Sequence, residues 1–483
     1  MAGDPPTHLA PPTAAGRLVV VSNRVGDPRN PAAGGLAIAL GDALSGTDSL
    51  WFGWSGRIGE RSGQPQTRHL GTTQVVTIDL DRADHDSYYL GHSNQALWPS
   101  FHSRLDLAEF ETGFIEGYAR VNALFADKLV PLLRANDVIW VHDYHLIPLA
   151  EALRARGCRQ RIGFFLHIPL PAPSLLTAIP GHEALMRAFF AYDVVGVQSQ
   201  ADADHFASYA TAEANARALP GDRFQGHGRE VTVRPFPIGI DVATFQRLLS
   251  QREAQETMEM LRQQYAKRRL LVGVDRLDYS KGLPQRFKAF RELLAHYPEN
   301  RSSATLIQIA SPTRESVHAY EDIRHELQSL AGEINGRYGE LDWMPIRYMN
   351  RMFARRRLPG LYRMAKAALV TPLRDGMNLV AKEYIAVQDP DDPGVLVLSR
   401  FAGAAEQMRE ALLVNPYDIP ATAKAIHVAL HMPLEERQER HRALLAHITR
   451  DDAARWRTTF LEALAAHEPA PWVAPRPLES TPL

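Results

Sequence analysis

The stretch TPLRDGMNLVAKEY runs from Thr371 to Tyr384 and follows the apolar run 367–370, which is typical of a buried parallel strand. Gly376 allows a tight turn and a close approach of the backbone to a ligand. We expect a helix from about Met377 that ends before Asp389, because a proline follows that residue. A strand, a glycine turn and a helix N-terminus together form an anion-binding site, since unpaired N–H groups point outward there.

Two carboxylates make this stretch unusual. Asp375 lies in the turn and Glu383 lies inside the predicted helix, with seven residues between them. Both carboxylates could face one ligand. An acidic residue is unusual in a phosphate-binding turn, unless that residue also binds hydroxyl groups of the ligand. The alternative is an N-cap aspartate and an ordinary exposed glutamate. This stretch alone favours neither interpretation.

Composition indicates a globular protein of two or three domains, because 483 residues exceed what one hydrophobic core holds. Hydrophobic residues make up 45% of the chain and charged residues 23%, which is usual for a globular protein in water. The net charge is −1, with 54 basic and 55 acidic residues, so charge favours neither nucleic acid nor an anionic membrane as a partner. The single cysteine, Cys158, excludes an internal disulfide and a multi-cysteine zinc site, and we interpret it as an ordinary surface or packing residue.

No targeting or membrane segment is expected. No apolar run approaches the ~20 residues that a membrane helix needs. The N-terminus has no basic residue before Arg17 and no apolar core, so a signal peptide is not predicted and a cytoplasmic enzyme is the default. Residues 1–16 are rich in proline and alanine and predict a disordered tail, and residues 468–483 predict a second loose tail.

Strand candidates alternate with helices along both halves of the chain. They lie at 17–22, 75–80, 138–141, 162–166, 194–197 and 231–236, and then at 270–274, 306–310, 346–349, 367–370, 395–398 and 412–414. This βαβα alternation predicts two Rossmann-like, doubly wound α/β domains with right-handed crossovers. The proline- and glycine-rich segment 235–241 marks the connection. We place the first domain at 17–238 and the second at 239–450, with a helix in 451–467 that packs back on the first domain.

Polar residues follow several strands of the first half, and ligands in open α/β sheets collect at the carboxyl ends of strands. Arg24 follows the first strand, and Gly34-Gly35 opens a predicted helix at 36–44. This glycine pair does not match the GxGxxG pattern of dinucleotide-binding proteins. The segments His142-Asp143-Tyr144-His145 and His167-Ile168-Pro169 follow two further strands and indicate one cleft.

Two of these histidines can be explained without a role in binding or catalysis. We favour a structural role for His142 and His145, and we reject a zinc site because their spacing is not a helical i, i+4 pair. Likewise, the aromatic segment 51–56 favours core packing over a sugar platform. The aromatic pairs around Tyr89 and Trp98 bracket an expected polar loop at 91–95, and loops often carry binding groups.

In the second half, Arg276 and Lys281 lie five residues apart in one loop after the first strand. A bidentate guanidinium and a compact ammonium suit a diphosphate. A solvated turn is the alternative, which we rank lower because the loop follows a core strand. Arg314 comes just after a second such strand.

Ten ordered blocks of this sequence resemble the trehalose-6-phosphate synthase family, between about Arg17 and about Trp456. They are VVVSNR, GGL, WFGWSG, NQALWPSFH, VIWVHDYHL, FFLHIPLP, VDRLDYSKGLPQRF, EDIRH, TPLRDGMNLVAKEY and SRFAGAAEQM. Members of that family are retaining glycosyltransferases of the GT-B fold, so the resemblance implies two Rossmann-like domains that face a central cleft.

The resemblance also implies roles for individual residues. The acceptor phosphate and its glucose would contact Arg24, Tyr89 and Arg314, with Trp98 and Asp143 on the same side. The catalytic set would be Asp375, Arg276, Lys281 and His167, in which Arg276 and Lys281 clamp the diphosphate while Asp375 and His167 meet the donor glucose. The rest of the donor would contact the backbone at Gly34 and Gly35, the side chain of Phe353 beside the base, and the run Gly376, Met377, Asn378, Leu379, Val380, Ala381, Lys382 and Glu383, with Glu383 on the ribose.

The implied reaction transfers glucose from a nucleotide diphosphate glucose, UDP-glucose first among them, to glucose 6-phosphate with retention. It needs no cofactor and no metal, and family members commonly form homo-oligomers, here a dimer or tetramer. Leu170, Ser174 and Val197 depart from the family pattern and leave a different phosphorylated acceptor open, such as glycerol 3-phosphate or a pseudo-sugar phosphate. A non-catalytic sugar-phosphate-binding regulator is the second alternative. The donor base stays open among UDP, GDP and ADP.

Overall fold

The computed structural model describes residues 16–26, 40, 44, 48–59, 63–313 and 318–467. Several sequence predictions lie outside these residues. They are all but the last residue of the tail 1–16, the tail 468–483, most of the helix 36–44, and the site residues Gly34, Gly35 and Arg314.

The first half of the chain forms a ten-stranded sheet with the order β3-β4-β2-β1-β5-β6-β7-β10-β9-β8. Its seven central strands run parallel: β1 (Leu18–Arg24), β2 (Ser49–Ile58), β4 (Thr73–Leu80), β5 (Val138–His142), β6 (Arg161–Phe165), β7 (Val194–Val197) and β10 (Arg229–Pro235). Antiparallel strands extend the two edges: β3 (Gln66–Leu70), β8 (Arg217–Leu219) and β9 (Arg223–Gly226).

The second half forms a six-stranded, fully parallel sheet with the order β13-β12-β11-β14-β15-β16. Its strands are β11 (Arg269–Arg276), β12 (Ala304–Ser311), β13 (Ile346–Met349), β14 (Ala367–Val370), β15 (Val395–Ser399) and β16 (Leu412–Val414). This is the doubly wound strand order in which the first strand lies beside the fourth, so the chain reverses direction across the sheet between β11 and β14.

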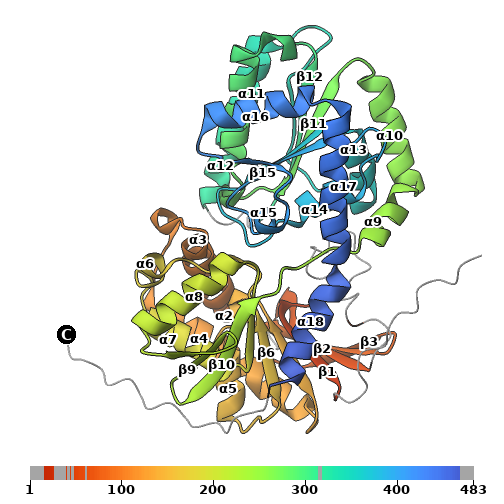
Figure 1. The fold of residues 1–483 in the computed structure, drawn as a ribbon. Coiled ribbons are helices and arrows are strands. Elements are labelled where there is room, and N and C mark those ends of the chain that lie inside the picture. The colour runs from red at the N-terminus through yellow and green to blue at the C-terminus, as the bar shows by residue number, and fades with distance from the viewer. Residues whose placement is uncertain are drawn as a thin grey trace, which may run out of the picture.

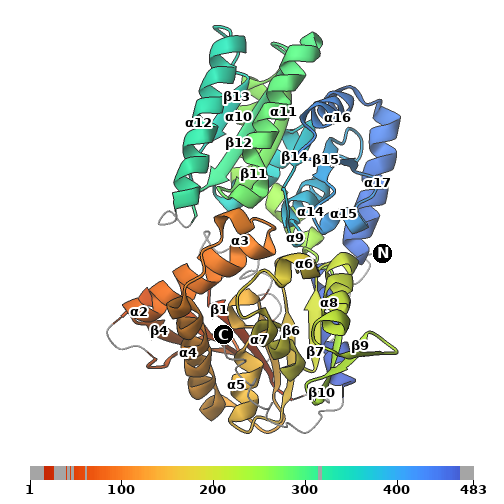
Figure 2. The same ribbon diagram turned by 90° about the vertical axis from the view of Figure 1, so that its left-hand side faces the viewer.

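Helices cover both sides of each sheet (Figures 1 and 2). In the first half they are α2 (Arg82–Asp84), α3 (Trp98–Phe101), α4 (Thr112–Leu129), α5 (Leu149–Ala155), α6 (Pro173–Leu176), α7 (His182–Arg187) and α8 (Gln200–Ala212). In the second half they are α9 (Val242–Leu249), α10 (Arg252–Gln264), α11 (Leu283–His296), α12 (His318–Tyr338), α13 (Leu358–Met364), α14 (Leu379–Ala386), α15 (Ala404–Gln407), α16 (Ile419–His431) and α17 (Leu434–Arg450). None of the described helices has the length and apolar character to cross a membrane.

The final helix, α18 (Ala453–Ala465), leaves the second half and packs on β6 and β7 of the first (Figure 1). Phe460 is fully buried there. Gly163 and Gly196 leave room for its ring, because a Cβ atom at either position would lie within 2.9 Å of a ring carbon of Phe460. The helix therefore closes the core under the middle of the first sheet.

The predicted fold, two doubly wound α/β domains of the GT-B type, is confirmed. Each predicted strand overlaps an observed one, whereas β2, β3, β8 and β9 were not predicted. The expected polar loop at 91–95 is wrong, because residues His85–Leu97 form a π-helical stretch that packs on α4. Asn94 bonds within the stretch, where its Nδ2 donates to the carbonyl of Tyr89 at 2.7 Å, whereas the buried His92 Nδ1 and Ser93 Oγ have no hydrogen-bond partner among the described residues.

Candidate active site

Both sheets have a point where the strand order reverses, and ligand sites of α/β proteins lie at the carboxyl ends of the strands at such a point. In the first sheet the reversal separates β1 from β5, and in the second it separates β11 from β14. The two points face each other across the halves, because the guanidinium carbon of Arg276, after β11, lies 5.1 Å from the ring centroid of Trp98 in the first half. Two predicted site residues from different halves, Arg276 and Trp98, are therefore brought together.

Lys281 and Asp375 form the central ion pair of this cleft. Lys281 Nζ lies 2.5 Å from Asp375 Oδ2, and the two side chains are only 11% and 13% exposed. Asn378 Nδ2 donates to the same oxygen at 3.0 Å. Asn378 takes a left-handed backbone with a φ of 71°, so α14 begins one residue later, at Leu379 rather than near Met377 as predicted.

The loops after β11 and β14 lie directly against each other. The N–H of Leu373 donates to the carbonyl of Ser280 at 2.7 Å. Gly282 has a φ of 63°, and a Cβ atom there would lie 2.4 Å from the carbonyl oxygen of Thr371. Only glycine accommodates both the positive φ and the close carbonyl oxygen. This close packing of the backbones is what brings Lys281 to Asp375.

Gly376 brings the second half against the first. A Cβ atom at Gly376 would lie 2.0 Å from the carbonyl oxygen of His167. Behind it, Gly403 approaches the carbonyl of Gly376 in the same way, where a Cβ atom would lie at 1.9 Å. The glycine turn predicted to approach a ligand thus also brings the backbone of the second half close to that of the first.

His167 lies at the end of β6 beside two polar partners. Its N–H donates to Asp143 Oδ1 at 3.2 Å, and its Nε2 lies 3.1 Å from Nδ1 of His142. Asp143 itself has a φ of 76°, and its N–H donates to the carbonyl of Phe165 at 2.8 Å. Burial lowers the pKa of His167 to about 3 and that of His142 well below its ordinary value, so both rings are neutral at pH 7.

Aromatic side chains surround Tyr89, one of the residues predicted to contact the acceptor. Tyr89 stacks on His145 with ring centroids 6.0 Å apart, and it also packs on Trp54 at 5.3 Å and on His85 at 5.6 Å. Arg24 is exposed at the end of β1. Gly56 leaves room for its guanidinium, because a Cβ atom there would lie 2.5 Å from Arg24 Nε.

His102 is a cleft residue that the sequence reasoning missed. It packs on Trp98 with ring centroids 4.1 Å apart, and its Nδ1 bonds the carbonyl of Trp98 at 2.7 Å. Burial lowers its pKa to about 4, while the carboxylates of Asp278 and Asp375 on the second half act in the opposite direction. The block NQALWPSFH contains this histidine, but only its spatial position next to Trp98 indicates a role.

On the predicted ribose side, Glu383 accepts a hydrogen bond from the hydroxyl of Tyr362 at 3.3 Å. Burial raises the pKa of this carboxyl, and the guanidinium of Arg355 acts against the increase. Phe353 is half-buried and packs against the second half's core. Both side chains lie on the second half, as expected for a nucleotide-binding domain.

Lys382 was predicted among the donor-binding residues, but its ammonium points elsewhere. Lys382 Nζ donates to the carbonyl of Ile238 in the crossover segment at 2.7 Å and to Gln407 Oε1 at 2.8 Å. Burial lowers the pKa of this amine to about 7. Any contact of Lys382 with the donor must therefore come from its backbone, while its side chain joins α14 to the crossover.

No metal-binding residues were predicted from the sequence, but the structure brings one cluster of possible ligands together, away from the predicted site residues. Glu299, His427 and His431 place one ligand atom each within 4.8 Å of the others. His427 and His431 are an i, i+4 pair on α16, which is a signal that the sequence reasoning overlooked. Arg269 Nη1 lies 3.1 Å from Nε2 of His431, and a guanidinium at this position opposes a bound cation.

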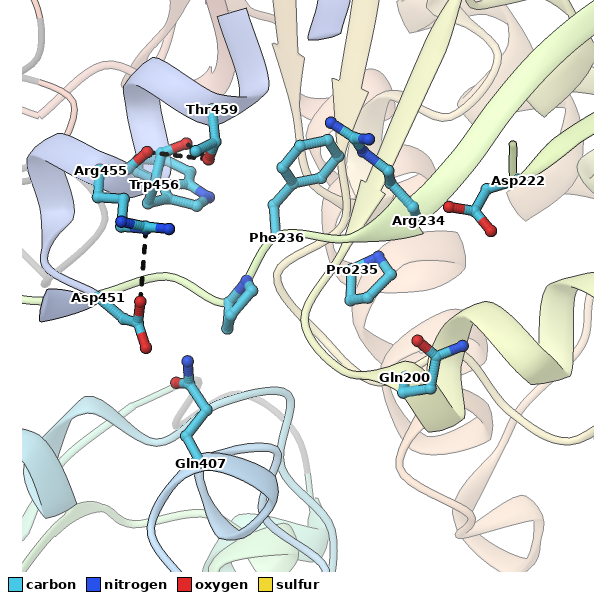
Figure 3. A pocket seen from close by; sticks show the side chains of 11 residues that line it. Gln200, Asp222, Arg234, Pro235, Phe236, Gln407, Asp451, Arg455, Trp456 and Thr459 are labelled. Atoms are coloured by element: carbon cyan, nitrogen blue, oxygen red, sulfur yellow. Dashed lines mark hydrogen bonds and ion pairs between the residues drawn. The ribbon is translucent and has the colours of Figure 1, made fainter. Parts of the chain in front are cut away.

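A cavity of about 390 Å³ lies between the halves at the crossover (Figure 3). It is bounded by Phe236 and Trp456, with Arg234, Arg455 and Gln407 among its polar residues. Its described lining includes none of the predicted site residues, so it is distinct from the cleft.

A sequence model described as "Glycosyltransferase family 20" matches residues 23–466. The chain belongs to glycosyltransferase family 20. The family resemblance predicted from the ten blocks is confirmed. The match covers α18 and every strand of both sheets except most of β1.

Relatives and solved structures give the same result. The chain is 46% identical over 460 residues to the trehalose-6-phosphate synthase of Enterobacter sp. (strain 638), covering 94% of this chain and 96% of that protein. It is 49% identical to the UDP-forming alpha,alpha-trehalose-phosphate synthase of Burkholderia xenovorans in complex with glucose-6-phosphate, with a TM-score of 0.90 and coverage of 93% and 100%. It is 43% identical to an E. coli structure described as trehalose-6-phosphate bound with UDP-2-fluoro glucose, with a TM-score of 0.91 and coverage of 94% and 100%.

Proposed function

We propose that this protein transfers glucose from UDP-glucose to glucose 6-phosphate with retention, giving α,α-trehalose 6-phosphate and UDP. The observation that carries this proposal is the Lys281–Asp375 pair at the reversal point of the second sheet. Its neighbours in sequence, Gly376 and Arg276, approach His167 and Trp98 of the first half, which supports one site shared by both halves. The ligands named for the solved relatives support both substrates.

The donor diphosphate would lie between Arg276, Lys281 and the first N–H groups of α14. The unpaired N–H groups at a helix N-terminus favour an anion, and the two cations neutralise the charge that develops as the diphosphate leaves. Asp375 would hold hydroxyl groups of the donor glucose opposite His167. Glu383 would hold the ribose, with Phe353 beside the base.

The acceptor phosphate would contact Arg24, Tyr89 and Arg314, with Trp98 and Asp143 beside the acceptor glucose. Clamping the phosphate orients the acceptor hydroxyl toward the donor C1 atom. The bond from C1 to the diphosphate oxygen then breaks and the bond from C1 to the acceptor oxygen forms on the same face. The acceptor proton passes to the leaving diphosphate oxygen, so no separate base is required.

Closure of the halves would exclude water from this step. The contact of Gly376 with His167 supports this view, because it brings the sugar-binding ends of both halves within van der Waals distance. Glu406 adds a second link, since its carboxylate accepts from the N–H groups of Gln200 at 2.8 Å and Ala201 at 3.2 Å, at the N-terminus of α8.

The proposal extends to the setting of the enzyme. We propose that it needs neither a cofactor nor a metal, acts in the cytoplasm, and forms a homo-oligomer, a dimer or tetramer. Arg276 and Lys281 support metal independence, because they supply two positive charges where a divalent ion would otherwise be required.

A crossed assay tests the function directly. Purified protein is incubated with UDP-, GDP- or ADP-glucose and with glucose 6-phosphate, glycerol 3-phosphate or glucose, and nucleoside diphosphate release is measured. We expect the highest kcat/KM for UDP-glucose with glucose 6-phosphate. A preference for glycerol 3-phosphate would establish the related-transferase alternative, and no turnover with any pair would establish the non-catalytic one.

A further inference from the structure

His142 and His167 share a hydrogen bond, and the neighbouring side chains can decide which of the two rings is the donor. His142 is fully buried at the end of β5, and its Nδ1 lies 3.1 Å from Nε2 of His167. Both rings are neutral at pH 7, as described above. Two neutral imidazoles share one hydrogen bond only if one nitrogen donates and the other accepts, so the tautomer of one ring dictates that of the other.

On the side of His142 that faces away from His167, three buried ring nitrogens lack a hydrogen-bond partner. His142 Nε2, Trp140 Nε1 and Trp456 Nε1 are buried and have no hydrogen-bond partner among the described residues. The rings lie together, with centroids 4.5 Å apart for Trp140 and His142, 4.9 Å for Trp140 and Trp456, and 6.3 Å for His142 and Trp456. Trp456 comes from α18 and also lines the cavity of Figure 3.

An indole nitrogen only donates. If His142 Nε2 carried a proton, three N–H groups would share this buried cluster and none would find an acceptor, which is costly. These three nitrogens do not bond one another directly. If His142 Nε2 is unprotonated, it supplies the one acceptor that the two indole N–H groups lack, through a bridging water. The second arrangement satisfies more of the buried groups.

We propose that His142 is a positioning residue that holds His167 in one tautomer, and that the N–H groups of Trp140 and Trp456 select it. In this arrangement His142 carries its proton on Nδ1 and donates to His167 Nε2. His167 then carries its proton on Nδ1, the ring nitrogen that His142 does not occupy. This inference rests on the proposed function, in which His167 meets the donor glucose.

The consequence for the reaction concerns the donor sugar. His167 is partly exposed, and its Nδ1–H donates a hydrogen bond to a hydroxyl of the donor glucose. A hydroxyl can both donate and accept a hydrogen bond. An imidazole that exchanges tautomers could therefore either donate to the hydroxyl or accept from it. Fixing the proton on Nδ1 leaves the hydroxyl hydrogen available for another acceptor, such as the carboxylate of Asp375.

The tautomers are measured by NMR of protein labelled with 15N in its histidine rings, without substrate. Protonated and unprotonated ring nitrogens have well-separated shifts, and the variants His142→Phe and His167→Asn assign the two rings. We expect both rings to be protonated on Nδ1 and to stay neutral at pH 6. A proton on Nε2 of either ring overturns the proposal.

Variants test what sets the tautomer. In His142→Phe, His167 loses its partner and should show a mixture of tautomers, whereas His142→Asn can place an amide donor where Nδ1 stood and should restore the single form. The double variant Trp140→Phe, Trp456→Phe removes both indole donors and should give mixed tautomers in both rings. Unchanged tautomers in this double variant refute the role of the tryptophans.

Kinetics test the positioning role. His142→Phe should lower kcat by about tenfold, the effect of one misdirected hydrogen bond, with the KM for glucose 6-phosphate unchanged and activity regained in His142→Asn. Phe165→Leu is the matched control, because Phe165 packs on both histidine rings but makes no side-chain hydrogen bond to them. A normal kcat in His142→Phe with mixed tautomers overturns the positioning role. Absence of transfer by the wild type with every donor refutes the proposed function instead, and the NMR result stands apart from it.

Discussion

Replacing Lys281 with alanine removes the ammonium that lies 2.5 Å from Asp375 Oδ2 and, in the proposed reaction, faces the leaving diphosphate. The two side chains are 11% and 13% exposed, so water cannot replace the lost charge fully. A preorganised electrostatic contact to a transition state contributes about 2.7–4 kcal/mol. We therefore expect kcat/KM to fall by about two to three orders of magnitude. The fold should stay intact, because the substitution leaves Leu277 and Tyr279, the core side chains of this loop, in place.

The assay is release of nucleoside diphosphate under initial-rate conditions, with circular dichroism as the check on folding. Lys288→Ala is the matched control, because Lys288 lies on the next helix, α11, and its only described ion pair is the surface contact with Glu326 at 2.9 Å. A double-mutant cycle with Asp375→Asn measures the pair itself. Because the two groups act as a unit, the double variant should lose much less than the product of the two single losses. Near-normal turnover of folded Lys281→Ala, or fully multiplicative losses, would refute the reasoning.

Four further perturbations follow from the same structure. Gly376→Ala should lower kcat/KM at least tenfold with a normal Tm, because its Cβ atom would force the halves apart at His167, whereas Gly332→Ala, which meets open space, should be silent. The folded pKa of Lys382 is about 7 against 10.5 for an exposed lysine, so the unfolded chain binds more protons between these values and stability rises with pH across the window. Lys382→Met should flatten that rise, by up to about 1.4 kcal/mol per pH unit, and calorimetric Tm profiles that stay parallel to the wild type would contradict this. Turnover should survive treatment with a chelator, and a loss that magnesium restores would count against metal independence. Arg314→Ala should reduce activity toward glucose 6-phosphate far more than toward glucose, so an equal loss of both would move this residue out of the acceptor site.

The strands were the most predictable part of the fold. For β7 and β14 the predicted and observed bounds coincide, because each is an apolar run buried within a parallel sheet. The antiparallel strands at the edges of the first sheet were missed for the opposite reason. β3 is the polar, mainly exposed segment QTRHL, and its pairing with β4 comes from the neighbouring strand rather than from its own pattern.

The candidate site also has parts that the sequence predicts and parts that only the structure shows. Arg276, Lys281 and Asp375 could be named from the sequence because each follows a core strand, but the ion pair between Lys281 and Asp375 joins residues 94 positions apart and needed coordinates. The direction of the Lys382 side chain could not be predicted either. On a buried helix neighbouring side chains point to different sides, so Glu383 faces Tyr362 while Lys382 turns to the crossover.

The return of α18 to the first half has a consequence for how the chain acquires its structure during synthesis. Domains usually fold as they leave the ribosome, N-terminal first. Here the ring of Trp140 in β5 stacks on Phe460 at 4.8 Å, so the first half waits for a segment translated more than 300 residues later. Until then its sheet has an uncovered apolar strip around Gly163 and Gly196, which is the kind of surface that chaperones bind. Chains truncated before α18 should therefore aggregate through the first half, although every strand of that half has been made.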